Sequence, residues 1–478
     1  MRRTFLRLAI VVGVLACTPI DVFAQTAQAP VEMNDDFFSR LFDAYADEFS
    51  PAPVQTALES ATPTRRPPPF PQSPLSSPPW PWTDWPFSGT NMIGGSTPNS
   101  VGNNLMKALH GTSVGDFLSD NNIEIWGWLN GGMNLSTSQG KKGNSPAGYD
   151  YDANTPMLNQ AVINFQRVPD TVQQDHVDWG FDITGLYGSD YRFVTMNGVF
   201  SNQLLKNDNE YGYDLTNFYF DVYIPWIGQG TNIRVGRYVT LPDIEADLAL
   251  QNVFYSHSLY YVFDPFTQMG VVVSTRLSKN WMVQIGISAG NDNAPWTSSA
   301  EPTGTACLQY ESDSSRDNVY LCANSTNDAL YGYNNVNLYV GTWFHRFTPR
   351  LWIATEDYYE YERKVPTVAT IPGANPALCA TGTSCWAGSY ALSLYVMYQL
   401  TDKDYVGLRS EGYDDVRGQR SGFATWYSEN TLGYVHWLTN SIALRPEIRF
   451  DHSYEASAYN NGKANSQLTA AADVLIKF

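Results

Sequence analysis

Beyond its first residues the chain has no long apolar run, and it is poor in cysteine, histidine and basic residues. No stretch of about 18 apolar residues, the length that a membrane-spanning helix requires, follows position 24. This absence excludes a helical membrane protein. A chain without such helices can cross a bilayer only as a closed β-barrel.

The shortage of basic residues restricts the partners. Acidic residues outnumber basic ones by 47 to 29, and the formal net charge is −18. Such a charge disfavours nucleic acid and anionic lipid headgroups as ligands. The six histidines are scattered, no cysteine or histidine cluster has metal-ligand spacing, and no Gly-x-Ser-x-Gly elbow occurs. We therefore predict no metal site, no cofactor and no enzymatic activity.

The N-terminal residues 1–24 are predicted to be a signal peptide. They combine a basic start with a short apolar run and the small-residue site "VFA". Cys17 follows "VLA", which weakly resembles a lipoprotein cleavage box, but Leu15 fits that box poorly. Export is the main prediction and lipidation the minor alternative.

Residues 25–121 differ in composition from the rest of the chain. The stretch 63–87, "PTRRPPPFPQSPLSSPPWPWTDWPF", is too rich in proline for a regular strand or helix, whereas residues 35–49 fit a short amphipathic helix. We interpret the segment as a periplasmic tether. The alternative is a docking segment for the cell wall or a partner.

Four cysteines follow the signal peptide, as two close pairs in loop-like sequence. In an exported chain they are expected to form two local disulfides, 307 to 322 and 379 to 385. The cysteines are Cys307, Cys322, Cys379 and Cys385.

Residues 122–478 are predicted to form an antiparallel up-and-down transmembrane β-barrel of about 14 strands. Short links such as "SK", "FTP" and "LTN" alternate with long links rich in Gly, Asn, Asp and Ser. This alternation is typical of outer-membrane barrels, which have tight periplasmic turns and long external loops. The predicted strands are 123–135, 157–168, 175–187, 215–226, 231–239, 267–277, 280–290, 335–346, 350–362, 389–400, 404–413, 424–437, 441–452 and 466–478.

The faces of these strands agree with a barrel. Trp179, Phe181 and Ile183 share one face of their strand, opposite Asp182 and Thr184. The apolar face is expected to contact lipid. The terminal stretch "QLTAAADVLIKF" alternates in the same way, so its last residue is expected to end the lipid-facing row and to lie in an aromatic girdle.

Several stretches resemble the outer-membrane β-barrel porins of the OmpL-like type. The resemblance spans most of residues 105–478 and implies a pore in the outer membrane, without catalytic residues and without a defined solute. Phe478 also resembles the signal by which the barrel assembly machinery recognises its clients. The stretches that carry the resemblance are "LMKALHG", "GWLNGGMNLSTS", "RVPDTVQQDHVDWGFDITGLYGSDYRF", "YGYDLTNFYFDVYIP", "NIRVGRYVTLPDIEADLALQN", "YSHSLYYVFDPFTQMGVVV" and "LRPEIRFDH".

The loop 239–267 is the candidate constriction of the pore. A long loop folded into the lumen narrows it, and carboxylates there influence selectivity. The alternatives are a solvated external loop, or charges that pair with one another and only fill the wall. The loop carboxylates are Asp243, Glu245 and Asp247, and the charges predicted to face the lumen are Arg234, Arg276, Arg409, Glu411, Arg445, Glu447, Arg449 and Lys477.

The predicted function is passive diffusion of small hydrophilic solutes or ions across the outer membrane of a Gram-negative-type bacterium. The expected partners are outer-membrane lipid, the barrel assembly machinery and these solutes, and a homo-oligomer is left open. The heavy aromatic content, 30 Tyr, 23 Phe and 14 Trp, also fits a glycan-binding or hydrolytic β-protein. A plugged structural barrel is the third hypothesis.

Overall fold

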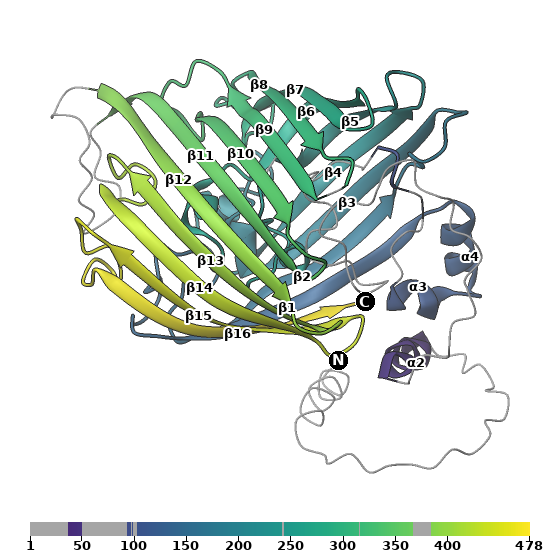
Figure 1. Ribbon diagram of the computed structural model, residues 1–478, viewed down its shortest axis with the longest axis horizontal. Coiled ribbons are helices and arrows are strands. Elements are labelled where there is room, and N and C mark those ends of the chain that lie inside the picture. The colour runs from purple at the N-terminus through teal and green to yellow at the C-terminus, as the bar shows by residue number, and fades with distance from the viewer. Residues whose placement is uncertain are drawn as a thin grey trace, which may run out of the picture.

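The computed structural model shows one closed antiparallel barrel in which β1 pairs with β16 (Figure 1). The structure describes residues 37–49, 93–96, 98, 103–240, 243–314, 316–366 and 384–478. The predicted signal peptide and most of the Pro-rich segment lie outside these ranges. The barrel strands are β1 (Glu124–Ser136), β2 (Pro156–Arg167), β3 (Asp178–Gly188), β4 (Gly212–Ile224), β5 (Thr231–Val239), β6 (Thr267–Arg276), β7 (Trp281–Asn291), β8 (Thr303–Glu311), β9 (Asp317–Thr326), β10 (Asn337–Arg346), β11 (Leu351–Pro366), β12 (Ser384–Gln399), β13 (Asp404–Asp415), β14 (Thr425–Trp437), β15 (Ile442–Ser453) and β16 (Ser466–Lys477).

Alternation of side chains decides which residues face outward. In β16, Leu468 and Val474 are exposed on the outer face, whereas Thr469 and Asp473 are buried inside. The same division holds in β3, where Trp179 is exposed and Asp182 is buried. A barrel with an exposed apolar wall and a buried polar interior is the reverse of a soluble β-protein. The predicted faces are therefore confirmed.

The predicted number of strands is wrong, because the barrel has sixteen. The missed hairpin is β8 and β9, which fall within the long link predicted between residues 290 and 335. Their sequences, "TGTACLQYE" and "DNVYLCANST", are rich in small and polar residues, so their alternation is weak. A missed hairpin adds two strands at once. The number of strands is therefore still even, and short and long links still alternate, as predicted.

The first predicted disulfide is present, but on strands and not in a loop. Cys307 and Cys322 are directly opposed residues of β8 and β9, and their sulfurs are bonded. Their Cα atoms are 4.1 Å apart. Cys385 lies in β12, and its predicted partner Cys379 lies outside the described residues.

Three helices lie together beside the end of the barrel that holds the C-terminus (Figure 1). They are α2 (Phe37–Phe49), α3 (Asn104–Leu109) and α4 (Ser113–Asp120). The first is the helix expected over residues 35–49, and the other two were not predicted. Tyr45 Oη donates to the Lys477 carbonyl at 2.7 Å, and Ser441 Oγ donates to Glu48 at 2.7 Å. Part of the segment before the barrel is therefore folded against the barrel's base.

Phe478 closes the seam of the barrel. Its backbone exchanges two hydrogen bonds with Gly127 of β1, at 2.9 and 3.0 Å. A Cβ at Gly127 would lie 2.1 Å from the Val162 carbonyl oxygen and 2.8 Å from the Phe478 ring, so a side chain there would disturb both β2 and the aromatic residue. Among the described residues, no helix has the length and apolar character needed to span a membrane.

Candidate functional site

The connection between β5 and β6, residues 240–266, lies inside the barrel. We call it the lumen loop; its residues 241 and 242 lie outside the described part. Nearly every described residue of this loop is buried, whereas an external loop would expose most of its surface. Two short helices shape it, η2 (Ala249–Gln251) and α6 (Leu259–Phe263). The apolar sequence around them is unusual for a connection and explains why the loop is buried.

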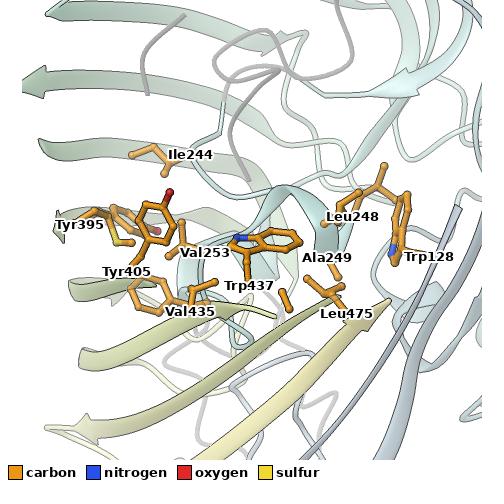
Figure 2. Packing of buried hydrophobic residues seen from close by; sticks show 14 of the residues in the cluster. Trp128, Ile244, Leu248, Ala249, Val253, Tyr395, Tyr405, Val435, Trp437 and Leu475 are labelled. Carbon is orange, nitrogen blue, oxygen red and sulfur yellow. The ribbon is translucent and has the colours of Figure 1, made fainter. Parts of the chain in front are cut away.

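An apolar cluster holds the middle of the lumen loop against the barrel wall. Leu248, Ala249 and Val253 of the loop meet inward-facing aromatic and aliphatic side chains near the short-turn end of the barrel (Figure 2). This contact removes apolar surface from water, which stabilises the loop in this position. The wall residues of the cluster include Trp128, Tyr395, Tyr405, Val435, Trp437 and Leu475.

Three buried arginines of the opposite wall bind the loop. Arg409 forms ion pairs with Glu245 of the loop at 2.6 Å and with Glu429 of β14 at 3.0 Å. Arg445 donates to the carbonyl oxygens of Ala249 and Asn252, at 3.0 and 2.6 Å. The third, Arg449, donates to the His257 carbonyl at 2.5 Å. These contacts cross the full width of the lumen, because β13 and β15 lie opposite the strands that bear the loop.

Three glutamates of the wall accept hydrogen bonds from loop amides. Glu356 of β11 accepts from Ile244 N at 2.8 Å. Glu411 of β13 accepts from Leu259 N at 2.7 Å and from Tyr260 N at 2.9 Å. Glu447 of β15 accepts from Tyr255 N at 3.0 Å and from Ser256 N at 3.2 Å. The wall arginines donate to backbone carbonyl groups of the loop, and the wall glutamates accept from its backbone amides. Together they satisfy backbone groups that a buried loop would otherwise leave unpaired.

The carboxyl groups of the lumen loop lie in different environments. Burial and the nearby charge of Asp243 raise the pKa of Asp264 well above its usual value. Burial also raises the pKa of Asp247, which accepts a hydrogen bond from Tyr149 Oη at 3.0 Å. For Glu245 burial opposes ionisation most strongly, but the positive charge of Arg409 together with the hydrogen bonds from Ser258 and Arg409 outweighs burial and lowers the pKa. Of Asp264, Asp247 and Glu245, only Glu245 has surroundings that favour the ionised form.

His257 lies at the centre of the loop, stacked on Tyr149 with ring centroids 3.6 Å apart. Burial lowers its pKa to about 4, so the imidazole is neutral at physiological pH. Within the described ranges, no group of three or more His, Cys, Asp or Glu residues could hold a metal ion.

Raising the pH from about 5 to about 9 is expected to loosen the lumen loop and increase channel conductance. A carboxyl whose pKa is raised by folding stabilises the fold below its unfolded pKa, and this contribution is lost as the pH rises through the folded pKa. Asp264 is such a group. Its ionisation beside Asp243 costs about 1.4 kcal/mol for each unit of elevation.

Single-channel recording across this pH range measures the effect. Asp264→Asn is expected to remove most of the pH dependence, since the amide resembles the protonated acid. Asp175→Asn is the control, because the Asp175 side chain is 84% exposed and far from the lumen loop in the sequence. An unchanged pH profile in Asp264→Asn would show that this carboxyl does not control the loop.

The structure brings together most of the predicted site residues. Asp243, Glu245 and Asp247 lie on the lumen loop, and the wall residues Arg409, Glu411, Arg445, Glu447 and Arg449 all contact that loop or its ion-pair partners. Three predicted residues lie apart. Arg234 pairs with Asp221 on the neighbouring strand at 2.8 Å, and Arg276 donates to the Lys279 carbonyl at the short-turn end. Lys477, the last residue of β16, has its Nζ 6.0 Å from the centre of the Trp126 ring.

Sequence reasoning missed several residues that hold the loop. Glu356 and Glu429 lie on predicted strands at positions whose alternation points inward, so the pattern was sufficient to find them. Gln160 also binds the loop: its Nε2 donates to Asp247 O at 2.6 Å, and its Oε1 accepts from Ala249 N at 2.9 Å. The alternation of side chains in β2 gives Gln160 no feature that would distinguish it from the other inward-facing polar residues.

A closed barrel with an apolar outer wall, and with a loop that crosses its lumen, defines a β-barrel porin. Residues 122–478 match the family described as "Putative beta-barrel porin-2, OmpL-like". The chain belongs to this family, and its activity is that of a passive diffusion channel. The predicted resemblance is confirmed.

Several solved porins and channels are similar to this chain. The anion-selective porin from Comamonas acidovorans has a TM-score of 0.46 and 10% identity, over 74% of this chain and 99% of that chain. The outer membrane channel DcaP of Acinetobacter baumannii has a TM-score of 0.47 and 11% identity, over 74% and 97% of the two chains. For OprB of Pseudomonas putida the values are 0.46 and 12%, over 77% and 96%. No curated protein matches the sequence.

Proposed function

We propose that this protein is an outer-membrane porin for small hydrophilic solutes or ions, whose passage is narrowed by the lumen loop. The observation that carries the proposal is the attachment of that loop to the opposite wall through Arg409, Arg445 and Arg449. A barrel of this strand number encloses a wide lumen if nothing fills it. The loop therefore controls how much of the lumen remains open.

We further propose that the loop carboxylates anchor the loop and do not attract permeant ions. Glu245 is paired with Arg409, and Asp247 accepts a hydrogen bond from Tyr149 Oη and has a pKa that burial raises. The wall arginines Arg445 and Arg449 have carboxylate partners of their own on β16 and β15. Because positive and negative groups are matched at short range, the field along the lumen is weak and the ion preference is expected to be small.

Planar-bilayer recording of the purified, refolded protein tests both statements. Discrete conductance steps are expected, with a reversal potential near zero under a salt gradient. A large reversal potential would contradict the anchoring role of the carboxylates. The absence of steps from protein with heat-dependent gel mobility would contradict the porin proposal and favour a plugged structural barrel, the alternative that the dense packing of the loop supports.

The location and assembly of the protein follow from the same proposal. The long links would face the outside of the cell and the short turns the periplasm. Phe478, at the seam of the barrel, would be the residue that the assembly machinery recognises. Residues before the barrel would contact the cell wall from the periplasmic side, where α2 lies beside the C-terminus (Figure 1).

A further inference from the structure

Helix α2 exposes a row of aromatic side chains. Phe38, Phe42 and Phe49 are 56%, 48% and 53% exposed. They are four and seven residues apart, so they lie on one face of the helix and form a continuous stripe. We call these three residues the aromatic stripe. Leaving so much apolar surface in water is unfavourable, and the stripe therefore requires an apolar environment.

The remaining surface of α2 is divided between protein contacts and an acidic face. Ala44 is buried, and Glu48, one turn further along, accepts a hydrogen bond from Asn104 Nδ2 of α3 at 2.9 Å. Asp43 and Asp47 are both exposed, and their spacing of four residues places them on a face of their own. A helix with one aromatic and one charged face is typical of helices that lie in the plane of a membrane surface.

The row that bears the aromatic stripe contacts the barrel beside the C-terminus, where the outer wall ends (Figure 1). Tyr45 belongs to this row, since it follows Phe42 by three residues and precedes Phe49 by four. Its Oη donates to the Lys477 carbonyl at 2.7 Å. Because Lys477 is buried on the inner side of β16, the next residue, Phe478, faces outward and ends the outer row. The stripe therefore begins beside the lipid-facing surface of the barrel.

Exposed apolar residues mark the same end of the barrel on other strands. Leu277, Leu400 and Leu438 are the first residues of the short turns after β6, β12 and β14, and each is about half exposed. The turn that contains Leu438 also contains Ser441, whose Oγ donates to Glu48 of α2 at 2.7 Å. Apolar residues at the end of a membrane-spanning strand lie at the boundary between hydrocarbon and headgroups. Helix α2 is therefore attached to the barrel at the level of this boundary.

We propose that the aromatic stripe lies in the inner leaflet of the outer membrane, so that α2 anchors the segment before the barrel in the plane of the membrane surface. Tyr45 and Glu48 hold the helix against the barrel rim. The stripe enters the boundary between lipid headgroups and acyl chains, and Asp43 and Asp47 face the periplasm. The acidic face prevents deeper insertion, because a carboxylate in hydrocarbon is costly. This inference rests on the outer-membrane location proposed above.

Photocrosslinking of the full-length protein in native outer membranes tests the proposal. The photoreactive residue p-benzoylphenylalanine, which inserts into nearby C–H bonds, replaces Phe42 of the stripe in one variant and Asp47 of the acidic face in another. A lipid adduct is expected at position 42, with a yield about tenfold above that at position 47. Phe218 on the outer wall of β4 is 55% exposed, and the same replacement there is the positive control. Mass spectrometry of the labelled peptide identifies each adduct, and heat-dependent gel mobility verifies that each barrel is folded.

A protein adduct at position 42 would show that the stripe binds a protein partner and would overturn the proposal. Equal lipid yields at positions 42 and 47 would also overturn it, and so would no adduct at position 42 in a membrane where position 218 gives a lipid adduct. No lipid adduct at position 218 would contradict the outer-membrane location itself. The failure of this inference is therefore distinguishable from the failure of the proposed function.

Discussion

Replacing residues 243–264 with a short Gly-Ser turn is expected to raise single-channel conductance about fivefold or more, because a barrel of this size encloses an aqueous lumen once the loop is gone. Val239 and Thr267 are directly opposed on β5 and β6, so a tight turn can close the gap without disturbing the strands. The outer wall and the barrel seam remain as they are. Conductance in planar bilayers measures the result.

The matched control is a deletion in an exposed part of another connection. Lys206 and Asn207 are exposed residues of the link between β3 and β4, and their removal should leave the conductance unchanged. Both variants must show heat-dependent gel mobility to count as folded. If the shortened barrel conducts no better than the wild type, the lumen loop does not limit the passage.

Arg409→Leu is expected to lower the free energy of unfolding by about 3–5 kcal/mol. The substitution leaves Glu245 and Glu429 buried without their cation, and it removes the hydrogen bond to Ser256 O, which is 2.7 Å long. Loss of one partner of a buried ion pair is costly because the remaining charge cannot be solvated. Urea unfolding in lipid vesicles, followed by tryptophan fluorescence, measures the change.

Lys142→Ala provides the comparison. Lys142 also forms an ion pair, with Asp208 at 3.0 Å, but both side chains are about half exposed. Solvent-exposed ion pairs contribute about 0–1 kcal/mol to the free energy of unfolding, so this variant should unfold at almost the same urea concentration as the wild type. Adding Glu245→Gln and Glu429→Gln to Arg409→Leu should recover part of the loss. Equal costs for Arg409→Leu and Lys142→Ala would mean that Arg409 does not hold the loop.

Alternation in the sequence was sufficient to place most side chains on the correct side of the wall. It also predicted that Arg409, Glu411, Arg445, Glu447 and Arg449 face inward, since each is separated from the next on its strand by one apolar or small residue. It failed at β8 and β9, where small polar residues weaken the outward apolar signal. The same weakness made Cys307 and Cys322 resemble loop cysteines.

Local patterns in the sequence were enough to predict the class of fold, the even number of strands, the face of each side chain and the family, because all of these depend on a period of two or on contiguous stretches. Which inward charges meet the lumen loop is visible only in the folded barrel. Glu245 and Arg409 are 164 residues apart, and Tyr255 and Glu447 are 192 apart. These contacts arise because sixteen strands close into one barrel. The closure fixes where along the barrel axis each inward-facing side chain lies, and toward which part of the lumen it points. No local pattern carries that information.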